Sequence, residues 1–340
     1  MKKLKKYTAT AMAGIMLLSL SGTITTSAQS LDENKVYLGG QPFGVKFYND
    51  GVIIVELEEF YDGAHYVCPS KEGGLKVNDI IKKANGTCVN SNEELQSVII
   101  NNKGNPIDFE IIRDGKTQKK SVTPQKNTAG LYLLGAWVKD SCAGIGTVTY
   151  YDPNNHYFAA LGHGICDNDT SALLPLGSAE IVNANISSVT KSTTGKPGSL
   201  NGYFTDETMG SLSKNTLNGI FGSMKSEDYS GYQTVTLATD KEIKIGKAEI
   251  YTTVDSGETK CYDAEITKLC NTDENSNENF VIKVTDKSLV EKCGGIVQGM
   301  SGSPVVQDNK LVGAVTHVFM NNPDEGYGVL IQNMVSKYNN

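Results

Sequence analysis

Short runs of alternating apolar and polar residues dominate the chain. Polar and apolar residues alternate around glycine-rich turns in residues 36–57, VYLGGQPFGVKFYNDGVIIVEL. They also alternate on both sides of the Asp114-Gly115 turn in residues 106–124, PIDFEIIRDGKTQKKSVTP. A period of two places apolar side chains on one face of a β-strand, and Asp-Gly is a common hairpin turn. The 35 glycines of the chain add many further turn positions. The pattern therefore predicts a mainly β protein.

One segment follows a helical period instead. In residues 90–105, NSNEELQSVIINNKGN, Ser91 stands three residues before Glu94, and Leu95 and Ile99 recur at helical spacing. Serine followed by glutamate at this spacing forms a capping box, in which each side chain accepts a hydrogen bond from the other residue's backbone amide. We therefore expect a helix that begins after Ser91.

The length and charge of the chain limit its organisation and its partners. A chain of 340 residues is long enough for two domains with separate cores. Residues 123–130, TPQKNTAG, are polar and contain Pro and Gly, which predicts the boundary between them. The formal net charge is -7, and no basic run occurs beyond Lys6. We therefore expect no nucleic-acid partner.

The N-terminus has the layout of an export signal. Four lysines among the first six residues precede an apolar stretch, and small residues follow up to Ala28. The apolar stretch is short for a membrane-spanning helix, which needs about 20 residues. Residues 1–28 are therefore expected to be a signal peptide, with retention as an N-terminal membrane anchor as the second interpretation. In both cases the rest of the chain works outside the cytoplasm.

The seven cysteines include no CxxC pair, and no Cys/His cluster has the spacing of zinc ligands. Export permits disulfides, but the spacings fix no pairing. We expect most of these cysteines to be buried apolar residues. We also expect no metal and no cofactor.

The first half of the chain resembles a PDZ domain at two places. Residues 73–86, GGLKVNDIIKKANG, resemble the short helix, strand and turn of this family, and residues 40–47, GQPFGVKF, resemble its carboxylate-binding loop and peptide-pairing strand. The resemblance implies a PDZ domain over residues 33–123 that either binds an extended peptide or braces the next domain. The peptide-binding residues would be Phe43, Gly44 and Val45.

Residues 146–164 predict a hairpin that ends at a histidine. A strand over 146–151 and a second strand that stops at Leu161 flank a turn, and His163 stands between two glycines. Small neighbours leave the imidazole open to a cleft, so His163 is the best candidate for a general base. The other histidines fit a polar loop, a solvated turn and a strand end: His65, His156 and His317.

Residues 298–317, QGMSGSPVVQDNKLVGAVTH, place small residues in one tight turn before two apolar strands. Such a turn can direct the amides of Gly299 and Ser301 toward one point, as an oxyanion hole requires. Ser301 is then the candidate nucleophile, with the histidine hairpin upstream in the chain. Ser303 is the next serine to consider.

These motifs together resemble the stage IV sporulation protein B peptidase family, exported serine peptidases of spore-forming bacteria with a PDZ domain ahead of a chymotrypsin-like domain. The similarity runs from about Tyr37 to Met334 and includes, in order, WVKDSCAGIGTVTYYDP, YFAALGHGICD, SLSKNTLNGIFG and GGIVQGMSGSPVVQDNKLVGAVTHVF. The resemblance implies a double β-barrel serine peptidase domain over residues 130–340. It also implies that His163 is the general base and Ser301 the nucleophile.

The same resemblance makes Asp286, in VTDKSL, the third member of a catalytic triad. In two-barrel peptidases this carboxylate usually lies between the histidine and the second barrel, whereas Asp286 stands shortly before Ser301. Asp286 could instead brace the serine loop. Asp169 and Asp206 are the alternatives, Asp206 because its spacing from His163 suits a partner in the first barrel.

By resemblance, the chain is expected to be a sporulation signalling endopeptidase in the space between the forespore and mother-cell membranes. It would cut itself near its own N-terminal segment and then clip an extracytoplasmic part of a membrane-anchored protein complex. Two other interpretations stay open: a catalytically silent PDZ protein that tethers a partner, and a general envelope quality-control protease. A PDZ domain ahead of the catalytic unit argues against the last of these.

Overall fold

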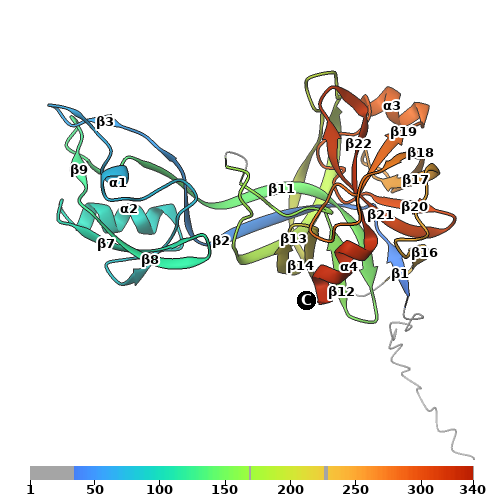
Figure 1. Cartoon of the computed structure of the whole chain (residues 1–340), viewed down its shortest axis with the longest axis horizontal. Coiled ribbons are helices and arrows are strands. Elements are labelled where there is room, and N and C mark those ends of the chain that lie inside the picture. Colours follow the sequence, from blue (N-terminus) through green and yellow to red (C-terminus); the bar gives the residue numbers. More distant parts are fainter. Residues whose placement is uncertain (1–33, 168–169, 226–228, 340) are drawn as a thin grey trace, which may run out of the picture.

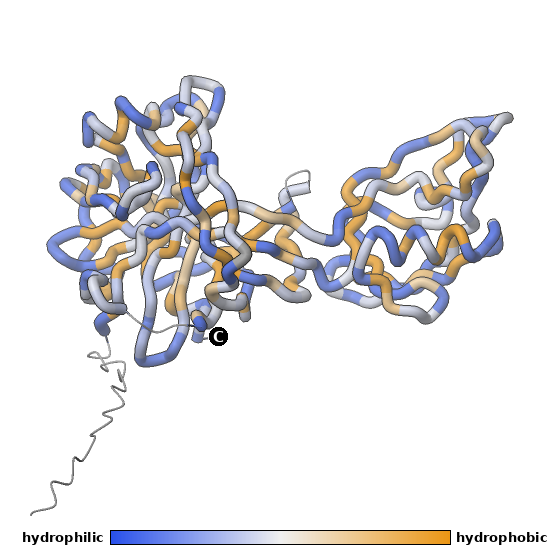
Figure 2. Tube along the Cα trace, turned by 180° about the vertical axis from the view of Figure 1, so that it is seen from behind, coloured by the Kyte–Doolittle hydropathy of each residue, from blue (hydrophilic) through white to orange (hydrophobic). Residues whose placement is uncertain are grey.

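Two lobes of unequal size make up the part of the chain that the structure describes (Figure 1). The computed structural model describes residues 34–167, 170–225 and 229–339. The predicted signal, residues 1–28, lies outside them. Apolar segments gather inside each lobe, as expected for two separate cores (Figure 2).

A long antiparallel ribbon joins the lobes and belongs to both of them. It consists of strand β2 (Pro42–Leu57) and strand β11 (Ala136–Asp152), which pair from Leu57 with Ala136 to Pro42 with Thr147. Beyond β11, strand β2 also pairs with β5 in the smaller lobe and with β13 in the larger one. The connection is therefore a continuous piece of sheet, not a loop.

The larger lobe begins with a closed antiparallel barrel around an apolar core. Each strand of the ring pairs with the next, and the last returns to the first. After β2 and in ring order, the strands are β13 (Leu176–Thr190), β14 (Ser199–Thr216), β15 (Gly219–Met224), β12 (Tyr157–Ala160) and β11. Phe43, Phe47 and Phe158 are fully buried at its centre.

A second closed barrel follows with its own core. Its strands, in ring order, are β17 (Gly246–Thr252), β18 (Lys260–Leu269), β19 (Phe280–Val284), β22 (Asn322–Leu330), β21 (Lys310–Phe319) and β20 (Pro304–Gln307). Ile250, Phe280 and Val305 are buried inside. Two barrels of this kind, side by side, are the architecture of the chymotrypsin-like fold, so the predicted fold class is confirmed.

Short elements hold the two barrels together. Strand β1 (Lys35–Leu38) pairs with β11, and strand β16 (Thr234–Leu237) pairs with β1 and with β21. Helix α4 (Ile331–Asn339) buries Met334 in the apolar cluster between the barrels. The cleft between the barrels is therefore bounded by elements fixed on both sides.

The smaller lobe has the PDZ layout of a sheet with one covering helix. Its sheet continues from β2 and β11 through β5 (Ile80–Ala84), β7 (Ile107–Arg113), β8 (Lys116–Val122) and β6 (Thr87–Cys88). The remaining elements are β3 (Phe60–Tyr61), β4 (Tyr66–Val67), α1 (Pro69–Glu72), α2 (Asn92–Asn101), β9 (Gln125–Lys126) and β10 (Tyr132–Leu133). Ile81, Ile107 and Phe109 form its core.

Ser91 caps helix α2 as predicted, but Glu94 bonds the amide of Asn90 and not that of Ser91, so only the serine half of the capping box forms. The Ser91 side chain accepts a hydrogen bond from the Glu94 amide at 3.2 Å, and the Glu94 carboxylate accepts one from the Asn90 amide at 2.7 Å. Leu95 is buried against the sheet. The helix predicted from Ser91 onward is therefore confirmed.

The segment predicted to bind peptide lies in the barrel instead. Residues 43–48 pair with β11 on one edge and with β13 on the other, so Gly44 stands between Ile145 and Val182. A ligand strand has no free edge to join there. Phe43 packs edge-on against Phe158 in the barrel core, which fixes the segment in the larger lobe. The structure thus corrects the assignment of Phe43, Gly44 and Val45 to a peptide site.

The two lobes do not consist of consecutive segments of the chain. Strand β1 and the first half of β2 belong to the barrels, and β11 begins in the PDZ lobe. The PDZ lobe is therefore inserted between β2 and β11, a hairpin of the first barrel. Both strands contribute apolar side chains to the cores of both lobes.

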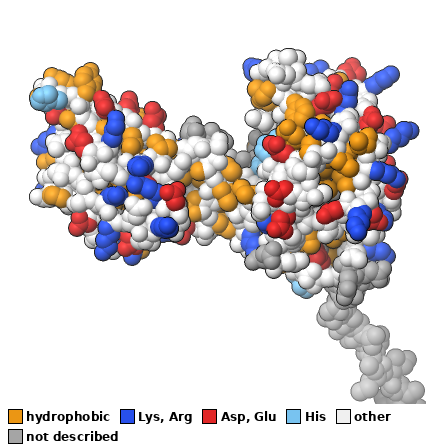
Figure 3. Space-filling model, viewed as in Figure 1, with side chains coloured by type: hydrophobic (Ala, Val, Ile, Leu, Met, Phe, Trp, Pro, Cys, Tyr) orange, Lys and Arg blue, Asp and Glu red, His pale blue; other side chains and the backbone are white. Residues whose placement is uncertain are grey.

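The seven cysteines are all free thiols. Cys68 and Cys293 are buried, but four others are exposed, so the expectation that most would be buried is wrong. On the face drawn in Figure 3, acidic and basic side chains are interspersed over both lobes, while the neck between them carries few charges.

Candidate active site

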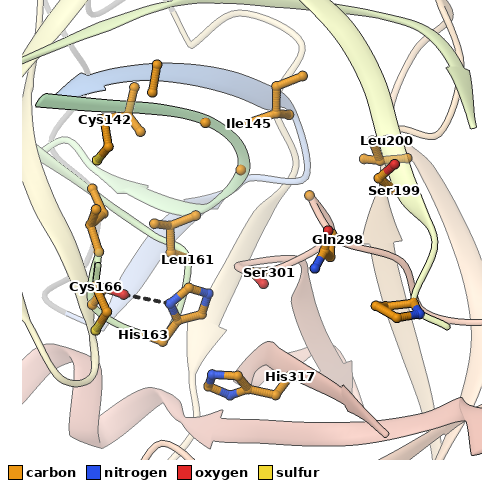
Figure 4. A pocket seen from close by; sticks show the side chains of 18 of the residues that line it. Cys142, Ile145, Leu161, His163, Cys166, Ser199, Leu200, Gln298, Ser301 and His317 are labelled. Carbon is orange, nitrogen blue, oxygen red and sulfur yellow. Dashed lines mark hydrogen bonds between the residues drawn. The ribbon is translucent and has the colours of Figure 1, made fainter. Parts of the chain in front are cut away.

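His163 and Ser301 come from different barrels and face the same cleft (Figure 4). His163 follows the end of β12, and Ser301 precedes β20. The cleft between them has a volume of about 940 Å³. The structure thus brings together the two residues that the sequence singled out from positions far apart in the chain.

The serine turn needs two glycines. Gly299 has a φ of 99° and Gly302 a φ of 93°, in the left-handed region that other residues rarely adopt. A Cβ on Gly302 would lie 2.0 Å from the Thr147 carbonyl oxygen. The first barrel therefore packs directly against this turn, and only glycine fits at the contact.

The amides of Gly299 and Ser301 are available to a ligand. Neither donates a hydrogen bond to any group in the described part of the chain. The turn that carries them is held from the first barrel, because the Thr147 hydroxyl donates to the Gly299 carbonyl at 2.8 Å and the Thr147 amide donates to the Ser301 carbonyl at 3.0 Å. Two open donors on one fixed turn are what an oxyanion hole requires.

The Ser301 hydroxyl is not bonded to His163 in this structure. Its Oγ donates a hydrogen bond of 2.8 Å to the carbonyl of Thr316, which lies on β21. Ser301 is half-buried, whereas the Ser303 hydroxyl is fully buried and without a described partner. Rotation about one side-chain bond would release the Ser301 oxygen toward the cleft.

The imidazole of His163 has a backbone carbonyl as its partner. Nδ1 lies 2.8 Å from the carbonyl oxygen of Gly164. When Nδ1 carries the proton it donates to this oxygen, and Nε2 is left as the acceptor that a general base needs. No carboxylate in the described residues bonds to this ring.

A second histidine stands beside the first. The ring centroids of His163 and His317 are 5.0 Å apart. Burial lowers the pKa of His163 to about 4, the Gly164 carbonyl partly offsets this, and His317 lowers the pKa further. Partial enclosure in the cleft also lowers the pKa of His317, although this residue reaches the surface. Both imidazoles are therefore neutral at pH 7.

Asp286 serves a helix, not the imidazole. Its carboxylate accepts hydrogen bonds from the amides of Ser288 at 2.9 Å and Leu289 at 3.1 Å, which caps helix α3 (Lys287–Cys293). Asp286 is absent from the cleft lining. Helix α3 leads into the serine turn, so this geometry agrees with a bracing role. Asp169 lies outside the described residues, and Asp206 falls within β14.

Three further residues of the site were missed from the sequence. The Thr147 hydroxyl bonds the serine turn, and the Thr316 carbonyl accepts a hydrogen bond from the Ser301 hydroxyl. Asp167 is a buried acid in the wall of the cleft, and its carboxylate lies 3.1 Å from the Lys139 ammonium group. Each depends on which strands become neighbours in space. Thr316 and His317 follow an apolar run, and this local signal indicates only a strand end.

The closed double barrel, with a serine and a histidine facing each other across its cleft, defines the class of chymotrypsin-like serine peptidases. The SpoIVB peptidase S55 family model matches residues 130–335, more than half of the chain, and the PDZ domain model matches residues 43–123. The chain belongs to the SpoIVB peptidase S55 family and is a serine peptidase with a PDZ domain. The predicted family and enzyme class are confirmed.

Individual relatives are more distant. A probable periplasmic serine endoprotease DegP-like from Pseudomonas savastanoi pv. phaseolicola is 45% identical over 56 residues, 16% of this chain and 12% of that protein. The chain thus matches only a small part of that relative's length. In the described residues, no helix has the length and apolar character to cross a membrane.

Several solved structures resemble parts of the chain at low sequence identity. The active form of the Rv3671c protease from M. tuberculosis has 10% identity and a TM-score of 0.35, covering 58% of this chain and 74% of that one. The HtrA-type protease AlgW with a tripeptide has 11% identity and a TM-score of 0.35, covering 58% and 55%. The PDZ domain of an SdrC-like protein from Listeria monocytogenes has 18% identity and a TM-score of 0.22, covering 26% and 87%.

Proposed function

We propose that this serine peptidase cleaves peptide bonds with a dyad of Ser301 and His163. The observation that carries the proposal is the pair of open amides, Gly299 and Ser301, on the turn beside Ser301 and opposite His163. A tetrahedral intermediate needs two such donors, a nucleophile and a base within one cleft.

The reaction starts when a substrate displaces the Ser301 hydroxyl from the Thr316 carbonyl. Oγ attacks the substrate carbonyl while Nε2 of His163 accepts the hydroxyl proton, and the carbonyl oxygen becomes an oxyanion. The C–N bond then breaks as His163 passes the proton to the leaving amine. Water repeats these steps on the acyl-enzyme, so the base is regenerated and Ser301 recovers its proton.

The Gly164 carbonyl takes the position that a triad carboxylate would occupy. It accepts a hydrogen bond from the N–H group at Nδ1 of His163. This bond holds the ring in the tautomer that leaves Nε2 unprotonated. Asp286, the third member implied by the family, acts on the serine turn through helix α3 in this proposal. A neutral acceptor stabilises the imidazolium less than a carboxylate does.

In the cell, the proposed role is sporulation signalling. The chain would be exported by residues 1–28, cleave its own N-terminal segment, and clip a membrane-anchored protein between the forespore and mother-cell membranes. The layout of residues 1–28 supports export, and the periplasmic assignment in the name of the DegP-like relative agrees with it. Membership of the SpoIVB family supports the signalling role.

The decisive experiment is Ser301→Ala, with Ser303→Ala as the matched control. The chain without residues 1–28 should cleave denatured casein and react with a fluorophosphonate probe, and Ser301→Ala should abolish both. Ser303→Ala should keep both, because the Ser303 hydroxyl is buried away from the cleft. A folded Ser301→Ala protein with full cleavage would overturn the assignment. A wild-type protein that fails in both assays would favour a tethering role.

The signalling role has a separate test in a spore-forming host. Deletion of the gene should stop spores at a late stage with earlier development intact, and Ser301→Ala should behave like the deletion. Self-processing is tested by the size of the Ser301→Ala protein in the same host. Identical processed bands in mutant and wild type would assign the cleavage to signal peptidase.

A further inference from the structure

Two histidines from different barrels lie beside each other in the catalytic cleft. His163 follows β12 of the first barrel, and His317 lies on β21 of the second. Their ring centroids are 5.0 Å apart, and the ring planes are inclined by 35°. Both line the cleft that contains Ser301 (Figure 4). The mechanism proposed above uses only His163 as a base, so the second imidazole has no direct part in it.

Each ring has a nitrogen that no described group occupies. Nδ1 of His163 lies 2.8 Å from the Gly164 carbonyl oxygen, which leaves Nε2 as a lone-pair donor. In the described part of the chain, no group hydrogen-bonds to the His317 ring, and this residue is exposed. Histidines that bind a metal through one nitrogen commonly donate the N–H of the other to a backbone carbonyl or carboxylate. The bond from His163 to Gly164 is of this kind.

The separation of the two rings suits one shared metal ion. Zinc binds an imidazole nitrogen at about 2.0–2.1 Å and prefers tetrahedral geometry. Each ring centre then lies roughly 3.2 Å from the ion, and two such centres at the tetrahedral angle are roughly 5.2 Å apart. The observed separation is 5.0 Å. His317 therefore has only to turn its exposed ring about its side-chain bonds.

The kind of donor decides which cation fits. Imidazole nitrogens suit zinc, copper and nickel, whereas magnesium and calcium prefer oxygen ligands. No carboxylate contacts either ring among the residues that the structure describes. The same residues contain no group of three His, Cys, Asp or Glu side chains around one metal position. Water would fill the remaining coordination positions, so the ion would bind reversibly and not as a resident cofactor.

We propose that one Zn²⁺ ion binds between Nε2 of His163 and the ring of His317 and reversibly inhibits the peptidase. The metal site goes beyond the proposed function, and only its inhibitory effect rests on that function. The ion occupies the Nε2 lone pair, so His163 can no longer accept the Ser301 proton. No covalent bond of the protein forms or breaks, and a chelator that removes the ion restores the base.

The first experiment measures inhibition with zinc chloride alone. The chain without residues 1–28 is freed of metal and assayed on a quenched fluorescent peptide library. Zinc should inhibit cleavage, EDTA should reverse the inhibition, and equal concentrations of magnesium or calcium should have no effect. Inhibition by magnesium and calcium at the same concentrations as zinc would overturn the imidazole site.

His317→Gln removes one of the two ligands, and His65→Gln is the matched control. Each variant is compared with its own rate without zinc. His317→Gln should raise the half-inhibitory zinc concentration at least about tenfold, since even the loss of an outer-shell partner costs about 10–100-fold in metal affinity. His65 lies on an exposed turn of the PDZ lobe, so its replacement should leave the wild-type value. An unchanged half-inhibitory concentration in His317→Gln would overturn the proposal.

The exposed thiols are the rival ligands for zinc. Four of the seven free cysteines are exposed, and one of them, Cys166, lines the same cleft. Cys166→Ser should leave the half-inhibitory concentration within about threefold of wild type, because the proposed site uses only nitrogen ligands. Loss of inhibition in Cys166→Ser, together with normal inhibition in His317→Gln, would assign the effect to the thiol and overturn the histidine site.

The second experiment measures binding without catalysis, in the Ser301→Ala chain. Calorimetric titration with zinc chloride should show one site more in this chain than in the same chain with His317→Gln added. His65→Gln should not change the number of sites. Equal titrations with and without His317 would overturn the metal site even if the peptidase works. A site that depends on His317, in a protein whose wild type cleaves nothing, would support the metal site and count against the catalytic proposal.

Discussion

The hydroxyl of Thr147 donates a 2.8 Å hydrogen bond to the carbonyl of Gly299, and this bond ties the first barrel to the serine turn of the second. On the same strand, the Thr149 hydroxyl donates to the Gly302 carbonyl at 2.8 Å. Both threonines are buried. The geometry of the proposed oxyanion hole therefore depends on a strand that also reaches the PDZ lobe.

Removal of the Thr147 hydroxyl should reduce catalysis more than stability. Thr147→Val keeps the side-chain shape but frees the Gly299 carbonyl, so we expect kcat to fall roughly tenfold with KM little changed, because the oxyanion forms only in the transition state. Thr147→Ser should restore the rate.

Thr149→Val is the matched control for this change. It removes a buried hydroxyl from the same strand at a similar cost of about 1 kcal/mol in unfolding free energy. Its bond goes to Gly302, beyond the two oxyanion amides, so kcat should stay near the wild-type value. Equal loss of kcat in Thr147→Val and Thr149→Val would show a general packing effect.

The acid limb of the pH profile should lie well below the usual range for histidine. Burial lowers the pKa of His163 to about 4 from an ordinary value of 6.5, and only the neutral ring can accept the Ser301 proton. A lowered pKa keeps the ring neutral at pH 6, so kcat/KM should stay level there and fall only as the pH approaches 4. A midpoint near 6.5 would show that the ring is solvated in the working enzyme.

His317→Gln tests the contribution of the second imidazole to this profile. His317 lowers the pKa of His163, so its replacement should move the acid limb to higher pH. Circular dichroism at each pH separates this shift from acid unfolding. A limb that moves to lower pH would contradict the proposed interaction.

The parts of the molecule that were predicted correctly carry local signals. The N-cap at Ser91 and the glycine-rich turn before Ser303 are short-range patterns whose geometry is set by neighbouring residues. His163 stands between glycines at a strand end, and the structure places it in the cleft with Ser301. The family blocks then supply the order of the two domains.

The features that differ from the sequence-based predictions depend on which segments of the chain become neighbours in space. In residues 42–57, Phe43, Val45 and Phe47 alternate with other residues and residues 52–55 form an apolar run, and neither pattern shows whether the strand enters one sheet or two. The burial of Phe43 in the barrel is a tertiary choice that the period cannot show. Similarly, spacing from Ser301 does not reveal that the Asp286 carboxylate points to its own helix.

Loss of the buried ion pair in the PDZ lobe should destabilise that lobe. Asp79 is fully buried, and Arg113 binds both of its carboxylate oxygens, at 2.6 Å and 2.7 Å. Arg113→Met leaves a buried charge without its partner, which should cost about 3–5 kcal/mol. Urea unfolding followed by the fluorescence of Trp137, the single tryptophan and part of this lobe, measures the change.

Lys83→Met is the comparison for that prediction. Lys83 pairs with Glu110 at 3.1 Å on the surface of the same sheet, and both side chains are partly exposed. Solvent screening limits such pairs to about 0–1 kcal/mol. If Arg113→Met costs no more than Lys83→Met, then the buried ion pair does not stabilise the lobe beyond what a surface pair contributes.

The last prediction separates two roles for Asp286. As the N-cap of helix α3, the residue can be replaced by Asn without losing the cap, whereas Ala removes it. We expect Asp286→Asn to keep kcat/KM within about threefold of wild type, because an asparagine caps a helix as well as an aspartate does. Asp286→Ala should lose about 1 kcal/mol of unfolding free energy and part of its activity, since α3 leads into the serine turn.

A triad carboxylate would behave differently, because its replacement by Asn lowers kcat by about 10⁴. A loss of that size in a folded Asp286→Asn protein would mean that the substrate-bound enzyme brings Asp286 to His163, and that the Gly164 carbonyl holds the ring only at rest.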